Sequence, residues 1–199
     1  MRTSHVNLGG ILAPMLIERV MALSAAESRG SDFGFEVVEE AAAPFDGPGL
    51  ARAVRVARYT KPYPTADRVL RSSRHGMIAV VRDRKRVVAR VVVSIAWNGC
   101  AQVDDLAVDR RFRRRGLAWR LMDEASLWAK EHGLPALRLE TQSTNVPACR
   151  FYERYGFELC GFDRRLYAAM PPLDRETALY WFLPLAKKRR AKPAPRALT

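Results

Sequence analysis

The stretch VDDLAVDRRFRRRGLAWRLMDEASLWAKEH, residues 103–132, decides the fold. It opens with the apolar run LAV at 106–108, which is typical of a buried strand. Five arginines then fall within 110–115, and Gly116 follows them. From Leu117 onward the apolar residues recur at the i, i+3, i+4, i+7 spacing of one buried helix face. The stretch therefore predicts a strand, an arginine-rich glycine turn and a helix.

The start of this helix indicates a binding site. Ser, Thr, Asp and Asn usually cap a helix, and none of them stands directly before Leu117. A helix N-terminus has free N–H groups and a partial positive charge, to which the arginines add. We therefore expect a site for a phosphate or pyrophosphate. The alternative, a solvated surface turn, stays open on these residues alone.

Length and charge limit the classes of protein that fit. The chain has 199 residues, 48% of them hydrophobic, which suits one domain with a core. Its net charge is +13, and residues 50–90 carry 12 basic and 2 acidic side chains. Such a balance favours anionic partners, either a cofactor phosphate or nucleic acid.

The three cysteines are an odd number without metal-ligand spacing, which predicts reduced thiols and no metal. The apolar N-terminal residues are too few and too interrupted for a membrane span or a signal peptide. We expect a soluble, cytoplasmic protein that makes no membrane contact.

The organisation along the chain follows from pattern and composition. Residues 1–31 are predicted to be an N-terminal extension with one amphipathic helix over 14–27. Residues 32–185 form the domain. Residues 186–199, which carry six basic side chains and no acid, are predicted to be a disordered tail.

Further strands are predicted from alternating or β-branched runs. They cover 33–38, 77–81, 87–95, 102–108, 136–140, 158–167 and 177–183. The run 50–59 fits either a strand or a helix, and a second helix is expected over 145–155. The strand at 136–140 follows a strand–helix unit, which predicts a parallel strand. The fold class is therefore α/β, with a mixed, mostly antiparallel sheet of about seven strands around a central strand–helix–strand unit.

Two motifs resemble those of the GNAT superfamily of N-acetyltransferases. The segment RRRGLA at 113–118 resembles its acetyl-coenzyme A pyrophosphate loop, Arg/Gln-x-x-Gly-x-Gly/Ala. A second segment, NVPACRFY at 145–152 with Gly156 and Phe157 after it, resembles the motif that holds the thiol end of the cofactor. The resemblance implies a GNAT-like fold and acetyl-coenzyme A as cosubstrate. The cofactor-binding residues that it implies are Leu106, Ala107, Val108, Arg113, Arg114, Arg115, Gly116, Leu117, Ala118, Asn145 and Ala148.

Acetyl transfer to an amine also needs an acid and a base. Tyr152 matches the superfamily tyrosine near the sulfur, and a phenol with a pKa of about 10 can protonate a thiolate. The alternative for Tyr152 is an ordinary core aromatic residue. Asp104, Asp105 and Glu140 lie on the two central predicted strands, and each is either a base or an ion-pair partner of an arginine. We take Tyr152 and Glu140 as the catalytic candidates.

A more specific resemblance covers 77–183. The residues that carry it include Trp97-Asn98, Leu139-Glu140-Thr141-Gln142, Asn145, Phe151-Tyr152, Cys160-Gly161, Asp163, Leu166-Tyr167 and Glu176-x-Ala178-Leu179-Tyr180. This set resembles the streptothricin (nourseothricin) acetyltransferases, which acetylate an amino group of the antibiotic's β-lysine moiety. The resemblance implies antibiotic resistance, with Trp97, Asp104, Glu140 and Asp163 as substrate contacts.

The chain departs from that family in one segment. Family members have an acidic segment before the second strand, whereas 52–74 is basic here and Asp67 is its sole acid. A different amine, such as a protein N-terminus, a lysine or a metabolite, is therefore the alternative acceptor. A further alternative is a non-catalytic protein of this fold that binds nucleic acid or the ribosome. Aromatic residues at core-like positions speak against it. A homodimer is compatible with the sequence.

Overall fold

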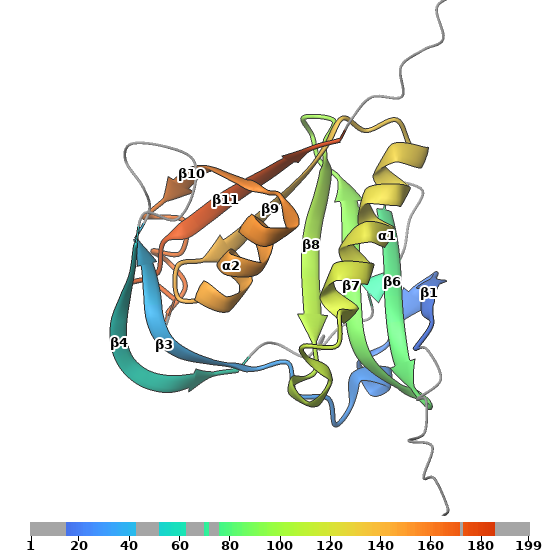
Figure 1. Ribbon diagram of the computed structural model, residues 1–199, viewed down its shortest axis with the longest axis horizontal. Helices are drawn as coiled ribbons and strands as arrows, with labels where there is room; N and C mark the ends of the chain where they lie inside the picture. The colour runs from blue at the N-terminus through green and yellow to red at the C-terminus, as the bar shows by residue number, and fades with distance from the viewer. Residues whose placement is uncertain (1–14, 43–51, 63–69, 72–75, 172, 186–199) are drawn as a thin grey trace, which may run out of the picture.

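A seven-stranded sheet in the order β1-β6-β7-β8-β9-β11-β10 forms the centre of the molecule (Figure 1). The computed structural model describes residues 15–42, 52–62, 70–71, 76–171 and 173–185. The predicted tail at 186–199 and the first fourteen residues lie outside the described part. The predicted fold class is confirmed, because this sheet is mixed and mostly antiparallel.

The first half of the sheet is an antiparallel meander. It consists of β6 (Gly76–Asp83), β7 (Arg86–Ile95) and β8 (Ala101–Val108). β6 and β7 form a hairpin whose turn lies at Arg84, which has a φ of 56°. Long β-branched runs explain why β6 and β7 are buried along most of their length.

The helix α1 (Leu117–Glu131) connects β8 to β9 (Ala136–Gln142) and packs on β6, β7 and β8. Its apolar face, which includes Leu121 and Met122, is fully buried as the periodicity predicts. β8 and β9 are parallel, but they pair only as far as the partners Val103 and Leu139. Beyond that pair the two strands diverge, as Figure 1 shows.

The second half of the sheet follows α2 (Val146–Tyr155). β10 (Glu158–Asp163) and β11 (Ala178–Pro184) pair with each other, and β11 inserts beside β9, all antiparallel. The predicted strand at 158–167 is too long, because the Asp163 carboxylate accepts a hydrogen bond from the backbone N–H of Arg165 (2.7 Å) and starts a turn.

A separate hairpin of β3 (Phe35–Ala42) and β4 (Arg52–Lys61) lies beside α2. The ambiguous run at 50–59 is therefore strand in its described part, from Arg52 onward. The hairpin is attached to the loop after β9, because the backbone N–H of Ala41 donates to the Ser143 carbonyl (2.8 Å).

The predicted helix over 14–27 is wrong. The described part of that segment forms β1 (Ile17–Val20), β2 (Ala22–Leu23) and a 3-10 turn, η1 (Ala25–Ser28). β1 pairs antiparallel with the otherwise open edge of β6, and β2 pairs with β5 (Leu70–Arg71). Pairing with strands that are distant in the sequence therefore outweighs the local amphipathic pattern, which favours a helix. Residues 15–31 contribute an edge strand to the main sheet.

Candidate functional site

A cleft of about 380 Å³ lies where β8 diverges from β9, between the N-terminal end of α1 and the helix α2. The residues predicted to bind the cofactor all line it apart from Arg115, and so does Tyr152. The strand-end sequence 106–108 and the two helices supply most of this lining. The structure thus brings together two motifs that are about thirty residues apart in the chain.

The N-terminus of α1 opens onto one end of the cleft. Gly116 is its N-cap residue and has a φ of 74°, a conformation that favours glycine. It provides no side-chain cap, and the first helical hydrogen bond runs from the Arg120 N–H to the Gly116 carbonyl (3.1 Å). The N–H groups of Leu117 and Ala118 therefore have no acceptor within the helix and are available to an anion.

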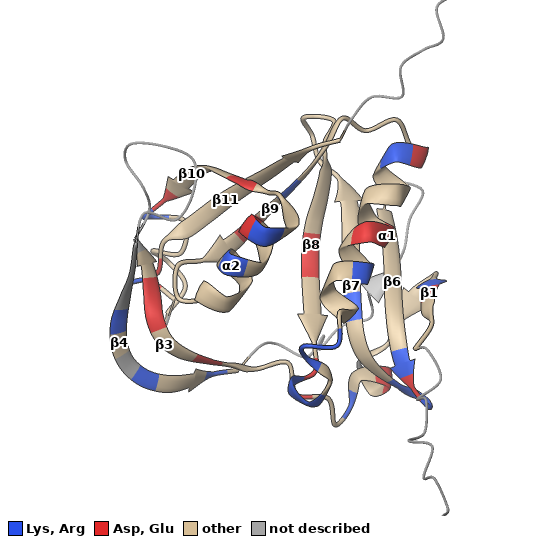
Figure 2. Ribbon diagram, in the orientation of Figure 1, with Lys and Arg blue, Asp and Glu red and all other residues tan. Residues whose placement is uncertain are grey.

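The arginines before α1, visible as a blue cluster in Figure 2, have different roles. Arg114 lines the cleft with an exposed side chain. Arg115 does not line it, because its guanidinium lies 5.0 Å from the centre of the Phe112 ring and donates to the Arg111 carbonyl (3.1 Å). Arg111 is bound to Asp109, with 2.7 Å between Nη2 and Oδ2.

Arg113 lines the cleft, but its guanidinium is turned to the backbone. Nε donates to the carbonyl of Val108 (3.0 Å), and Nη2 donates to those of Phe33 (2.9 Å) and Gly34 (2.7 Å). Burial lowers the pKa of Arg113, and Arg110 lowers it further. These hydrogen bonds account for the position of the Arg113 side chain without a bound anion.

Sequence reasoning missed several residues of the cleft. Arg154 lines it from α2, and together with Pro147 and Phe151 it follows the i, i+4, i+7 spacing of one helix face, a signal that was present in the sequence. Phe33 and Phe35 line it from the other side, and nothing local in the sequence indicates them.

α2 begins at Asn145, whose side-chain oxygen accepts a hydrogen bond from the Ala148 N–H (3.3 Å). This cap fixes the helix that carries Tyr152. Tyr152 is 7% exposed and packs against aromatic rings, with centroid distances of 5.5 Å to Phe151 and 6.0 Å to Trp181. It is therefore both a core residue and part of the cleft lining.

The electrostatic environment keeps Tyr152 protonated. Burial raises the pKa of its phenol, and nearby Cys149, Asp105 and Glu140 raise it further. At neutral pH the hydroxyl therefore carries its proton, as a general acid must.

Glu140 lies half-buried on β9 and accepts a hydrogen bond from the Tyr167 hydroxyl. Burial raises the pKa of Glu140, while the hydrogen bond from Tyr167 and the charge of Lys61 act to lower it. Side chains alternate along β9, so Glu140 and Leu139 lie on opposite faces of the sheet. The cross-strand partner of Leu139 is Trp181, which packs against Tyr152. Glu140 and Tyr152 thus lie on opposite sides of the sheet.

Two more carboxylates lie on β8. Asp104 is the bulged residue, because Val92 pairs with Asp105 and Val93 pairs with Val103. Asp104 is exposed, and partial desolvation raises its pKa. Asp105 instead binds Arg90, with 2.5 Å between Oδ2 and Nε, so the ion-pair alternative applies to it.

The remaining predicted substrate contacts lie in different places. Asp163 shares a sheet face with Glu140, because their partners on β11, Ala178 and Tyr180, are two residues apart. Trp97 lies in the turn between β7 and β8, at the opposite end of β8 from the arginines, and is 95% exposed. The structure therefore groups Glu140 with Asp163 and leaves Trp97 on its own.

In the described residues, no group of His, Cys, Asp and Glu side chains could hold a metal ion. None of the helices described is both long and apolar enough to cross a membrane.

A sheet that opens between two parallel strands, with a helix N-terminus and arginines at one end of the opening, is an arrangement suited to an anionic ligand. The sequence model of the acetyltransferase (GNAT) family matches residues 36–157, which is more than half of the chain. The protein therefore belongs to this family, as the two motifs predict.

Within that family the chain is similar to streptothricin acetyltransferases. It is 37% identical to one from Escherichia coli over 98 residues, 49% of this chain and 56% of that protein. It is 36% identical to streptothricin acetyltransferase A of Bacillus subtilis over 48% of this chain and 54% of that protein. The chain thus covers little more than half the length of these curated relatives.

Solved structures match over more of the chain. A nourseothricin acetyltransferase is 30% identical with a TM-score of 0.70, over 85% of this chain and 99% of that one. A candidate streptothricin acetyltransferase from Bacillus anthracis, crystallised with acetyl coenzyme A, is 27% identical with a TM-score of 0.70 over the same shares.

Proposed function

We propose that this protein transfers an acetyl group from acetyl-coenzyme A to a primary amine, and that the acceptor is the β-lysine amino group of a streptothricin-type antibiotic. The observation that carries the proposal is the cleft itself, which has the N-terminus of α1 at one end and Tyr152 in its lining. The similarity to a protein crystallised with acetyl coenzyme A supports this cosubstrate.

Different residues of the cleft bind different parts of the cosubstrate. At 106–108 β8 no longer pairs with β9, so the backbone on that side of the strand can hydrogen-bond the pantetheine arm. The N–H groups of Leu117 and Ala118 face the pyrophosphate, with Arg114 and Arg154 as charge-assisted donors. Asn145 and Ala148 line the side that α2 provides.

The proton transfers are assigned to Glu140 and Tyr152. The acceptor arrives as an ammonium ion, and Glu140, whose pKa is raised by burial, takes its proton directly or through water. The amine nitrogen then forms a bond to the acetyl carbon as the carbon–sulfur bond breaks. The acetylated nitrogen releases its second proton to water, while Tyr152 gives its proton to the departing thiolate and regains one from water.

A cationic acceptor requires negative charge on its side of the sheet. Glu140 and Asp163 provide carboxylates on one sheet face and Asp104 provides another on β8, whereas the exposed indole of Trp97 lies apart from them. Their charges favour an amine with more than one ammonium group.

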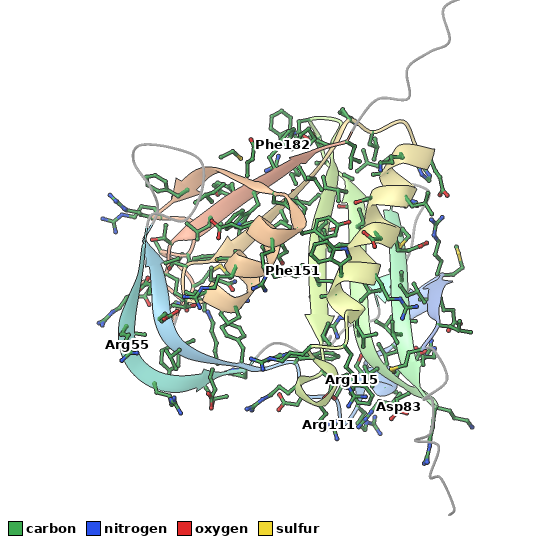
Figure 3. All side chains as sticks on the ribbon, in the orientation of Figure 1. Arg55, Asp83, Arg111, Arg115, Phe151 and Phe182 are labelled. Atoms are coloured by element: carbon green, nitrogen blue, oxygen red, sulfur yellow. The ribbon has the colours of Figure 1, made fainter. Side chains whose placement is uncertain are left out.

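The described part of the basic segment at 52–74 does not argue against a cationic acceptor. Lys61 is neutralised by Glu176, at 2.5 Å between Nζ and Oε2. Arg55 lies opposite Glu39 in the β3–β4 hairpin and extends from its outer side in Figure 3. Of the charges on β4, Lys61 is therefore paired and Arg55 is directed outward.

The test is the release of coenzyme A from acetyl-coenzyme A with streptothricin as acceptor, run beside lysine, polyamines and a basic peptide. Turnover with streptothricin far above the other amines is the expected result. Turnover confined to another amine would keep the transferase and replace the acceptor. Absence of coenzyme A binding, judged by protection against heating, would contradict the proposal as a whole.

A further inference from the structure

The guanidinium of Arg113 holds the segment before β3 against the end of β8. A guanidinium has five N–H donors, and three of those in Arg113 are bound to the carbonyls of Val108, Phe33 and Gly34 at 3.0, 2.9 and 2.7 Å. Two of these acceptors are about eighty residues away in the chain. One side chain thus joins two segments that share no sheet pairing.

Additional bonds fix the same junction. The backbone N–H of Asp32 donates to Oδ2 of the fully buried Asp109 (3.1 Å), and the Arg110 N–H donates to the Asp32 carbonyl (2.8 Å). Ser31 Oγ donates to the carbonyl of Val87 on β7 (2.7 Å). Residues 31–34 are therefore held along one side of the arginine-rich turn.

The segment held in this way forms one wall of the cleft. Phe33 and Phe35 both line it and are 4% and 6% exposed. The Phe33 ring also packs under the guanidinium of Arg90, 4.6 Å from its centroid, so it has little freedom to move. A wall of two phenyl rings suits the uncharged pantetheine part of a cofactor rather than its phosphates.

We propose that Arg113 is a positioning residue: it fixes Phe33 and Phe35 as the wall against which the pantetheine arm binds, and it is not the phosphate ligand of the turn. Arg114, which is exposed and lines the cleft, is the arginine of the turn that contacts phosphate. The inference rests on the proposed binding of coenzyme A in this cleft.

The test compares Arg113→Met with the matched neighbour Arg114→Met, using two ligands. Coenzyme A is titrated by calorimetry, and pantetheine, which lacks every phosphate, is titrated by NMR. Arg113→Met should raise the dissociation constants of both ligands about tenfold. Arg114→Met should weaken coenzyme A alone. If Arg113→Met weakens coenzyme A and leaves pantetheine unchanged, Arg113 is a phosphate ligand and the proposal is wrong.

Hydrogen exchange gives a second readout that needs no ligand. Amides of residues 33–35 should exchange at least tenfold faster in Arg113→Met and at the native rate in Arg114→Met. Phe33→Ala, which keeps Arg113, should reproduce the loss of pantetheine binding. If Arg113→Met does not fold, Arg113→Lys replaces it, because an ammonium cannot reach all three carbonyls. Native exchange rates in the Arg113 variant would overturn the proposal alone. Lack of coenzyme A binding by the unmodified protein would overturn the proposed function and, with it, the assignment of the wall to pantetheine.

Discussion

The hydroxyl of Tyr167 donates a hydrogen bond to Oε1 of Glu140. Tyr167 is buried in the turn region after β10, whereas Glu140 lies on β9. Burial raises the pKa of Glu140, and this hydrogen bond opposes the rise because it stabilises the carboxylate. Tyr167 therefore helps to set the pH at which the proposed base is charged.

Tyr167→Phe should shift the pH dependence of kcat/KM. Without the hydroxyl the pKa of Glu140 rises further, so the base is charged only at higher pH. The rising limb of the profile then moves to higher pH, and activity at pH values below the limb falls. Initial rates across pH 5 to 9 measure this shift. Tyr180→Phe is the control, because it removes a tyrosine hydroxyl from the cross-strand partner of Glu140. An unmoved limb in Tyr167→Phe would exclude Glu140 as the titrating base.

Tyr152→Phe should lower turnover by roughly 10²- to 10⁴-fold, the usual contribution of a general acid. Coenzyme A affinity should stay nearly constant, because the ring that packs in the core remains. Tyr155→Phe is a control on the same helix, since its hydroxyl donates to Asp123 (2.8 Å) away from the cleft. Equal turnover in Tyr152→Phe and the unmodified enzyme would remove Tyr152 from the mechanism.

Arg154→Gln should weaken coenzyme A binding about two- to fivefold, the equivalent of ~0.5 to 1 kcal/mol for an exposed charge pair. The loss should decrease as salt rises, because exposed charges are screened. Arg150→Gln is the matched control, four residues earlier on α2 and bound to Glu39 at 2.7 Å. Titration at two salt concentrations measures both variants. A loss of the same size in Arg150→Gln would mean that only the overall charge of the helix matters.

Local patterns predicted the elements that position the site. The structure agrees to within a residue or two with the predicted strand at 102–108, the turn at Gly116 and the start of helix α1. The reason is physical: hydrophobic period, a left-handed glycine and an N-cap are properties of neighbouring residues. The same holds for α2, where Asn145 is the cap.

Contacts between distant segments were beyond that reasoning. Arg113 fits a phosphate-loop motif, but its partners Phe33 and Gly34 lie far away in the chain. The hydrogen bond from Tyr167 to Glu140 spans 27 residues. β1 pairs with an edge of β6 that exists only once the sheet has formed. No periodicity within one segment encodes such partners.

The ion pair of Lys61 and Glu176 should contribute to the stability of the hairpin's attachment. The two side chains are 13% and 9% exposed, and Thr144 Oγ1 also donates to the carboxylate (3.1 Å). Lys61→Met should destabilise the fold by about 3 to 5 kcal/mol, because it leaves a buried carboxylate without its cation. The double variant with Glu176→Gln should lose less than Lys61→Met alone, since no charge is then left uncompensated. Urea unfolding midpoints measure each free energy. Arg55→Met, on the same strand but exposed, should stay within about 0.5 kcal/mol. A Lys61→Met protein as stable as the unmodified one would mean that water already compensates Glu176, and the ion pair would then not secure β4.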